Sequence, residues 1–176
     1  MKIAALIALA TLATAPLASA ADRFWYVGAG AVESDLGLAE FDNSATGWKV
    51  FGGYRFTRII AAEAGYLDTG DAEETIEGTD VTLNASGTHV SVVAAWPIGE
   101  SFALHARAGM IDWEAELTLS DGIVTQTSSA NGQDLYWGAG GTFNFSETLG
   151  LRLEYEVPEI EDVDVSSISL SVLYRF

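Results

Sequence analysis

The sequence predicts an all-β fold, an eight-stranded antiparallel up-and-down β-barrel that spans a membrane. Three observations predict it. Apolar and polar residues alternate in eight segments, and the links between these segments are alternately short and long. After the first twenty residues, no stretch approaches the roughly 18 apolar residues that a membrane helix needs. An even strand count with short turns at one end and long loops at the other is typical of a transmembrane barrel.

The first twenty residues predict a secretory signal peptide. Lys2 supplies a positive charge, residues 3–13 form a short apolar stretch, and Ala18-Ser19-Ala20 is a small-x-small cleavage site. The apolar stretch is too short to span a membrane as a helix. We therefore expect cleavage of residues 1–20, which leaves residues 21–176 as one barrel domain.

A period of two predicts strands with two unlike faces. It is clearest in residues 149–157, where every second residue is apolar and three of the four residues between them are charged. The last segment also alternates, because apolar residues at 168, 170, 172, 174 and 176 are separated by Ser169, Ser171, Leu173 and Arg175. In chain order, the expected strands are 24–32, 47–56, 59–67, 88–96, 102–113, 135–145, 149–157 and 168–176.

The links between the expected strands fall into two classes. Residues 57–58, 97–101 and 146–148 are short links, whereas 33–46, 68–87, 114–134 and 158–167 are long and polar. Both termini then lie on the short-turn side. We expect that side to face the periplasm of a Gram-negative bacterium, with the barrel in its outer membrane.

A soluble eight-stranded barrel, such as a lipocalin, would also alternate, but its apolar face would point inward. Here charged residues such as Glu63, Arg107 and Arg152 share the smaller face, while the other face is rich in Leu, Val, Ala and aromatic residues. Aromatic residues gather at the strand ends, as in the girdles of a membrane barrel. They are Trp96, Phe102, Phe143, Phe145, Tyr174 and Phe176 near the short turns, and Trp48, Tyr66 and Trp137 near the long links.

Several motifs resemble the OmpA-like transmembrane domain family of small outer-membrane β-barrel proteins. Residues 46–56 and 62–66 are similar to its second and third strands, and 136–140, 144–145, 151–155 and 173–176 are similar to its sixth, seventh and eighth. The resemblance implies an outer-membrane barrel of the porin family type, and it covers the whole chain after the signal. Larger members carry a periplasmic peptidoglycan-binding domain after the barrel. Because this sequence stops at Phe176, we do not expect cell-wall anchoring.

The resemblance extends to Tyr174 and Phe176. Tyr174-Arg175-Phe176 is similar to the C-terminal signal by which outer-membrane barrels are recognised for assembly. It implies that Tyr174 and Phe176 bind the barrel assembly machinery during biogenesis.

The overall charge narrows the range of partners. The formal net charge is −17, which argues against nucleic acid as a partner. There is no cysteine, so neither a disulfide nor a thiolate metal site is available. We expect a monomer whose partners are outer-membrane lipid and lipopolysaccharide, with no cofactor and no metal.

The lumen is the first candidate site. The expected register turns inward five of the seven basic residues that follow the signal, together with several acidic residues and both histidines. One interpretation is an ion-pair network that plugs a narrow interior, because buried charges must be paired. The other is a gated or narrow polar pore. The residues expected in the network are Lys49, Arg55, Glu63, Arg107, Arg152 and Glu154.

His89-Val90-Ser91 is the only arrangement that suggests catalysis. Some eight-stranded outer-membrane barrels are lipid A deacylases whose motif contains His-x-Ser, and their triad must face the lipid. Here Val90, Val92, Ala94 and Trp96 occupy the lipid face, which places His89 and Ser91 inside. We therefore expect no catalytic residues. Gly28, Gly30, Gly138, Gly140 and Gly141 lie within expected strands, so barrel curvature explains them better than a nucleotide-binding loop.

Acidic residues gather in two of the long links. The simplest interpretation is a solvated face, and the alternative is diffuse binding of divalent cations near lipopolysaccharide head groups. They are Asp71, Glu73, Glu74, Glu77 and Asp80 in one link, and Glu159, Glu161, Asp162 and Asp164 in the other. No segment matches the calcium-binding loop of an EF-hand.

The sequence therefore predicts a non-enzymatic barrel that contributes to outer-membrane integrity and surface interactions. A small porin-like channel for ions or solutes is the alternative, and a lipid A-modifying enzyme is a more remote one.

Overall fold

The computed structural model describes residues 24–35, 45–76, 79–120, 125–159 and 166–176. The expected signal peptide, residues 1–20, lies outside these ranges. The described residues form eight strands: β1 (Phe24–Asp35), β2 (Ala45–Arg55), β3 (Ile60–Ile76), β4 (Thr79–Ile98), β5 (Phe102–Ser120), β6 (Thr125–Asn144), β7 (Leu149–Pro158) and β8 (Ser166–Arg175).

The strands close into one barrel in chain order. Each strand pairs antiparallel with the next, and β1 pairs with β8 from Tyr26↔Arg175 to Asp35↔Ser166. Where the barrel is closed, every strand has a neighbour on both sides. The backbone donors and acceptors of this part are therefore satisfied within the sheet. The predicted eight-stranded antiparallel up-and-down barrel is confirmed.

The short turns all lie at one end of the barrel, as predicted. Residues 56–59, 99–101 and 145–148 connect β2 to β3, β4 to β5 and β6 to β7. Hydroxyl side chains fix two of them, because Thr57 Oγ1 accepts hydrogen bonds from the backbone of Ile60 at 3.0 Å and Ser146 Oγ does so from Leu149 at 3.0 Å. The third turn has Gly99 at φ +74°, a conformation that glycine adopts without strain.

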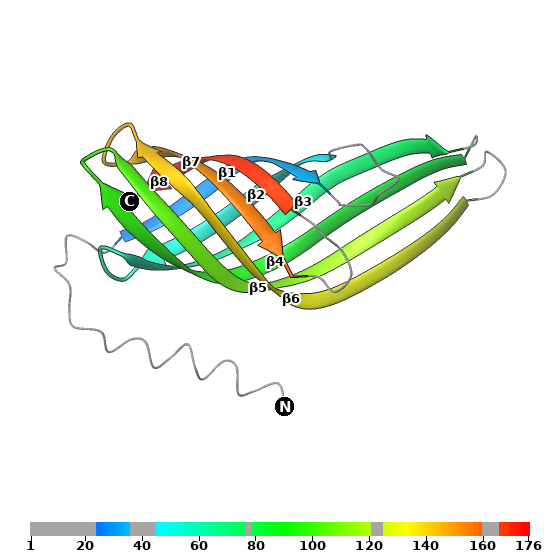
Figure 1. Ribbon diagram of the computed structural model, residues 1–176, viewed down its shortest axis with the longest axis horizontal. Coiled ribbons are helices and arrows are strands. Elements are labelled where there is room, and N and C mark those ends of the chain that lie inside the picture. Colours follow the sequence, from blue (N-terminus) through cyan, green and yellow to red (C-terminus); the bar gives the residue numbers. More distant parts are fainter. Residues whose placement is uncertain (1–23, 36–44, 77–78, 121–124, 160–165) are drawn as a thin grey trace, which may run out of the picture.

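The prediction of long loops at 68–87 and 114–134 is wrong. Strands β3 to β6 continue through nearly all of these residues, with gaps in the described chain only at 77–78 and 121–124. Figure 1 shows these four strands projecting beyond the ends of β1, β2, β7 and β8. We call residues 69–76, 79–87, 111–120 and 125–134 the extension. The ladder between β4 and β5 passes from the barrel into the extension without interruption, from Ile98↔Phe102 to Asp80↔Ser120.

The β3 strand enters the extension through a β-bulge between Asp68 and Asp71. Gly70 has φ +74°, and its backbone N–H donates to Asp68 Oδ1 at 2.8 Å. Thr69 Oγ1 donates to the carbonyl of Ala85 at 2.9 Å. These bonds replace ladder contacts that the bulge removes, so pairing with β4 resumes at Asp71↔Asn84.

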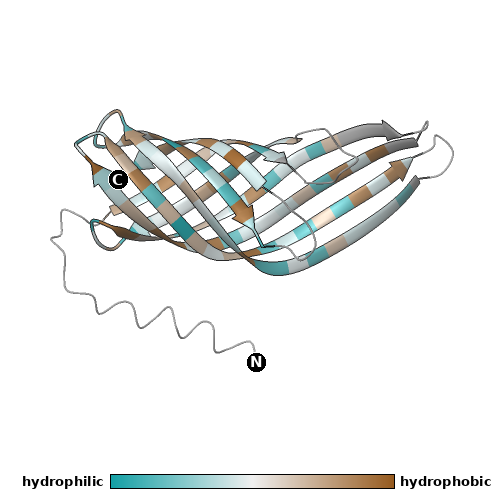
Figure 2. Ribbon diagram, in the orientation of Figure 1, coloured by the Kyte–Doolittle hydropathy of each residue, from teal (hydrophilic) through white to brown (hydrophobic). Residues whose placement is uncertain are grey.

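The two faces of the strands alternate, as predicted, but the outer face changes from apolar to polar along β4, β5 and β6. On the outer face, Val90, Met110 and Leu135 form one row of neighbours, and the next outer row is Thr88, Asp112 and Gln133. Figure 2 shows the corresponding mixture of apolar and polar positions along these strands. Below this boundary the outer face is apolar, and above it the outer face is polar.

The inner face changes in the opposite sense. In the barrel it carries His89, Ser91 and Arg107, all of them buried. In the extension, the inner positions of β4 and β5 hold Val81, Leu83, Ala85, Ile111, Trp113, Ala115, Leu117 and Leu119. Leu83 packs there against Ala45 and Ala72.

Candidate functional site: a buried ion-pair cluster

The barrel interior is occupied by charged side chains from four strands. We call them the ion-pair cluster: Lys49 of β2, Glu63 of β3, Arg107 of β5, and Arg152, Glu154 and Glu156 of β7. No member is more than 7% exposed. Alternation places these residues inside, because the opposite positions on the same strands carry the apolar outer face.

Glu63 is the acceptor that joins β1, β5 and β7. Its Oε1 accepts hydrogen bonds from Tyr26 Oη at 2.5 Å and from Arg152 Nη1 at 2.6 Å. Its Oε2 accepts from Arg107 Nη2 at 2.5 Å. Three charge-assisted hydrogen bonds therefore satisfy one buried carboxylate, which would otherwise be costly to remove from water.

The second half of the cluster is held by the two glutamates of β7. Lys49 Nζ donates to Glu154 Oε2 at 2.8 Å and to Glu156 Oε2 at 2.7 Å. Arg107 Nη1 lies 3.1 Å from Glu154 Oε1 and 3.0 Å from Glu156 Oε1. His105 Nε2 lies 2.9 Å from the same oxygen of Glu154. Arg107 thus links both halves of the cluster.

The charges within the cluster balance, since three carboxylates meet three cations when His105 is neutral. Arg107 and Arg152 also form cation–π contacts with aromatic rings. Arg152 lies 5.1 Å from the ring centre of Phe51 and 5.6 Å from that of Tyr26, and Arg107 lies 5.6 Å from that of Tyr136. Such contacts stabilise a desolvated guanidinium.

Two glycines make room for the cluster. A Cβ atom at Gly53 would lie 2.4 Å from the Tyr26 ring and 2.8 Å from Glu63 Cγ. A Cβ atom at Gly138 would lie 3.0 Å from Glu156 Cγ and 3.3 Å from Arg107 Cγ. The interior of an eight-stranded barrel is only wide enough for side chains, so larger residues here would displace the ion pairs.

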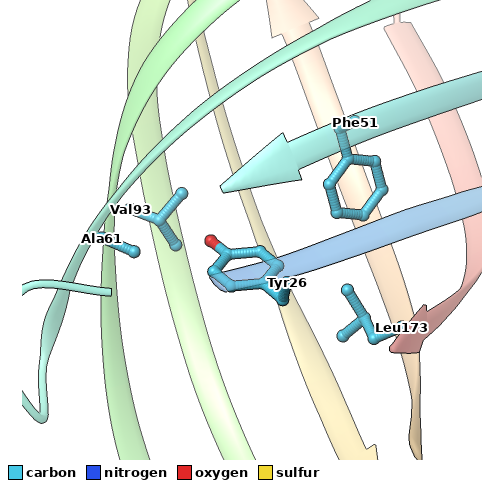
Figure 3. Close-up of a cluster of buried hydrophobic side chains, with 5 residues drawn as sticks. All are labelled: Tyr26, Phe51, Ala61, Val93 and Leu173. Atoms are coloured by element: carbon cyan, nitrogen blue, oxygen red, sulfur yellow. The ribbon is translucent and has the colours of Figure 1, made fainter. Parts of the chain in front are cut away.

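An apolar layer lies beside the cluster toward the short turns. It consists of Tyr26, Phe51, Ala61, Val93 and Leu173, all at most 4% exposed. Figure 3 shows Tyr26 in the middle of this layer, with Phe51 and Leu173 on one side and Ala61 and Val93 on the other. Through its hydroxyl group Tyr26 also belongs to the hydrogen-bonding shell of Glu63.

Five of the six residues expected in the network meet in the cluster, and one does not. Arg55 lies apart: its Nη1 donates to the carbonyl of Arg58 at 3.1 Å, and among the described residues it forms no ion pair. Glu156 and Tyr26 belong to the site although they were not among the six. Glu156 follows the inward alternation of β7, whereas the run Phe24-Trp25-Tyr26 is aromatic on both faces and gives no such signal.

His89 and Ser91 point into the barrel, at 5% and 6% exposure. Ser91 Oγ accepts a hydrogen bond from Arg107 Nη2 at 3.0 Å. His89 lies 5.5 Å from Tyr136, ring centre to ring centre, and its Nε2 has no hydrogen-bond partner among the described residues. The two side chains are thus directed to the lumen rather than to the lipid.

The remaining predicted residues lie on the outside or beyond the described chain. Tyr174 and Phe176 are 48% and 65% exposed, and the Phe176 N–H donates to the carbonyl of Trp25 at 3.1 Å. Their role in assembly stays a prediction. Of the acidic residues, Asp71 accepts a hydrogen bond from Asn84 Nδ2 at 3.1 Å, and Glu159 is exposed. The side chains of Glu73, Glu74, Glu77, Asp80, Glu161, Asp162 and Asp164 lie outside the described residues.

In the described ranges, no group of three or more His, Cys, Asp or Glu residues is arranged to hold a metal ion. Nor does any helix in these ranges have the length and apolar character needed to cross a membrane.

Comparison with known proteins identifies relatives of this arrangement. A family model described as outer membrane protein beta-barrel domain matches residues 4–176. Outer membrane protein A of Salmonella typhi is 27% identical over 191 residues, which cover 99% of this chain and 54% of that protein. The protein of the same name from Shigella flexneri is 26% identical, with 99% and 55% covered. The chain thus spans about half the length of the curated relatives it matches.

Solved structures share the fold. Ail, the attachment invasion locus protein of Yersinia pestis, crystallised with the heparin analogue sucrose octasulfate, matches with a TM-score of 0.64 at 20% identity, covering 88% of this chain and 97% of that one. Neisserial surface protein A matches with a TM-score of 0.61 at 16% identity and the same coverage.

Proposed function

The chain belongs to the outer membrane protein beta-barrel domain family, and from that premise we propose that it is a non-enzymatic barrel whose lumen is closed by the ion-pair cluster. It is an outer-membrane protein of the same type as outer membrane protein A and Ail. Its proposed role is to contribute to the integrity of the outer membrane and to surface interactions, with the short turns and both termini in the periplasm.

The observation that carries the proposal is the charge balance of a fully buried cluster. Glu63 binds Tyr26, Arg107 and Arg152 at 2.5–2.6 Å, so its carboxylate has no room for a hydrated ion. An ion-selective pore would need charges that can exchange a protein partner for a passing ion. Here each carboxylate of the cluster already contacts at least two cations.

Three further proposals follow from the same premise. Residues 1–20 act as a cleaved signal peptide, Tyr174 and Phe176 act in recognition by the assembly machinery, and the barrel is a monomer in contact with lipid and lipopolysaccharide. The inward direction of His89 and Ser91 supports a barrel without lipid-directed catalysis.

Single-channel recording of the refolded chain in planar bilayers tests the plug. We expect the wild-type barrel to show almost no conductance and Glu63→Gln to produce measurable steps, because the variant loosens two ion pairs at once. Ser169→Ala is the matched control, since Ser169 is buried in the lumen and its Oγ has no hydrogen-bond partner among the described residues.

The competing function is a narrow porin-like channel. Such a channel would conduct before any mutation, and Glu63→Gln would mainly change its ion selectivity. Long-lived openings of the wild-type barrel, together with unaltered stability of Glu63→Gln, would reject the plug and favour the channel.

A further inference from the structure

A cavity of about 770 Å³ lies inside the barrel at the short-turn end. Its mouth lies among the three short turns, because Arg58, Glu100 and Glu147 each belong to a different one and all three line it. On the inside it reaches Arg152 and His105 at the edge of the ion-pair cluster. A volume of this size is typical of small-molecule sites.

Two arginines in its wall differ from the cations of the cluster. Arg55 and Arg175 are partly buried, and neither lies within 4.0 Å of a carboxylate among the described residues. Arg55 donates to the carbonyl of Arg58, and Arg175 donates to the Asn144 side chain. Both hydrogen-bond acceptors are neutral, so neither positive charge forms an ion pair within the part of the chain that the structure describes.

One aromatic ring brings the two charges together. The guanidinium groups of Arg55 and Arg175 lie 5.4 Å and 5.9 Å from the ring centre of Phe24. Like charges that share one ring repel each other, and a single anion between them would relieve the repulsion. Guanidinium groups suit this role, because their planar N–H groups match the oxygens of phosphate and carboxylate.

Buried N–H donors in the cavity wall also favour an anionic ligand. Arg55 Nε and Arg152 Nε are buried N–H donors of residues that line the cavity, and neither has a hydrogen-bond partner among the described residues. Buried donors are ordinarily paired. The acidic residues of the cavity, Glu100 and Glu147, are instead exposed at its mouth.

Most of the rest of the wall is apolar. Val93 and Leu173 of the apolar layer line the cavity together with Ala95, Pro97 and Ala103, and Thr142, Asn144 and Thr148 add polar groups. A ligand that fills this space therefore needs an apolar body as well as an anionic group.

We propose that this cavity binds an oxyanion carried on a small apolar body, with Arg55 and Arg175 holding the anionic group. The oxyanion is a phosphate or a carboxylate, and the site is independent of whether the ion-pair cluster blocks conduction. In a chain of net charge −17, Arg55 and Arg175 face this open volume with no carboxylate within 4.0 Å among the described residues.

Calorimetric titration of the refolded chain in lipid nanodiscs tests the proposal. The probes are phenyl phosphate and benzoate, which share the aromatic body and differ in the oxyanion, and inorganic phosphate, which lacks the body. We expect binding of at least one aromatic probe at about millimolar concentration or below, and weaker binding of inorganic phosphate. Tighter binding of phenyl phosphate would identify a phosphate as the ligand group, and tighter binding of benzoate a carboxylate.

Arg55→Gln and Arg175→Gln should each weaken binding by roughly tenfold or more, because each removes a charge-assisted hydrogen bond. Glu114→Gln is the control: it removes a charge from the exposed outer face of the extension, away from the cavity lining, and should change the affinity less than about twofold. Arg55→Lys keeps the charge without the planar fork and should give an intermediate loss.

The shift between unheated and boiled samples on an SDS gel shows whether each variant is folded, since a closed barrel resists cold SDS. A folded wild-type barrel that binds neither aromatic probe would overturn the proposal. So would a folded Arg55→Gln variant that binds both probes as tightly as the wild type.

Discussion

The extension continues four of the eight strands of the barrel, and along β4 and β5 the two regions have opposite polarity. In the barrel, β4 and β5 turn Val90 and Met110 outward and His89 and Arg107 inward. In the extension, the same strands turn Asn84, Glu114 and Glu116 outward and Leu83, Ile111 and Leu117 inward. The pairing register does not change between the two regions of β4 and β5.

This difference shows that the surroundings, and not the sheet, decide which face is apolar. The ladder between β4 and β5 is continuous through both regions, so the ladder itself has no preference. In a bilayer the outer face must be apolar, whereas in water an antiparallel sheet shields its apolar face. The reversal falls between the row Val90, Met110, Leu135 and the row Thr88, Asp112, Gln133. We infer that the bilayer ends there.

The largest expected effect comes from a charge on the inner face of the barrel. Glu63→Gln leaves Arg107 and Arg152 buried without a full counter-charge, which costs about 3–5 kcal/mol in a well-packed site. Glu114→Gln makes the same chemical change on the exposed outer face of the extension and should cost less than about 0.5 kcal/mol. Urea unfolding in lipid vesicles, followed by tryptophan fluorescence, measures both. Equal costs would mean that the lumen is as well hydrated as the surface.

The sequence predicted the barrel well because one physical rule acts on all eight strands. Each strand that crosses the membrane must alternate, and each short turn leaves too few residues for anything but a hairpin. The sequence does not predict the extension, because its apolar residues lie on the inner face and its polar residues on the outer face, the opposite of the barrel. The many polar residues of its outer face resemble those of a loop. In residues 111–120, apolar residues still recur at every second position, so a search for period two without regard to sign would have found this strand.

The ion-pair cluster could be predicted only in part. Inward direction follows from parity, which is why Lys49, Glu63 and Glu154 were expected in the lumen. The choice of partner for each charge depends on the tilt of the strands and on the reach of the side chains across the barrel. Residue spacing in the sequence determines neither. Arg55 and Arg175 have the same parity as the cluster, yet they lie nearer the short turns and face the cavity instead.

The second largest effect is expected from a lysine on the outer face of β4, compared between the barrel and the extension. Val92→Lys places a charge on the apolar face of the barrel and should cost about 2–4 kcal/mol. Thr82→Lys lies on the same face of the same strand, ten residues away in the extension, and should cost less than about 0.5 kcal/mol. The same unfolding experiment measures both variants. A similar cost at the two positions would contradict a bilayer boundary near Thr88.

A smaller effect is expected on the inner face of the extension. Leu83→Asn replaces an apolar contact with Ala45 and Ala72 by a polar side chain and should cost about 1–2 kcal/mol, because Leu83 is only partly buried. Amide hydrogen exchange should show faster exchange in the extension with unchanged protection in the barrel. Thr82→Asn, on the outer face next to it, is the control. Loss of protection in both regions would show that the extension and the barrel unfold as one unit.

The smallest effect tests a single hydrogen bond between β5 and β6 in the extension. Trp113 Nε1 donates to Asp134 Oδ2 at 2.6 Å, and the indole lies over Gly132, where a Cβ atom would be 2.8 Å from the ring. Trp113→Phe removes the donor and keeps an aromatic ring, so it should cost about 1 kcal/mol at this partly exposed site. Trp48→Phe is the control, because Trp48 is 49% exposed on the apolar outer face and its indole makes no hydrogen bond with a described residue.

A double-mutant cycle with Asp134→Asn separates the hydrogen bond from the loss of ring area, since only the bond couples the two positions. We expect a coupling free energy of about 0.5–1 kcal/mol, measured from the exchange rates of amides in residues 111–120 and 125–134. If the variants also change the amide exchange rates in β7 or β8, the extension does not unfold independently of the barrel. The change in polarity would then not coincide with a boundary between regions of different stability.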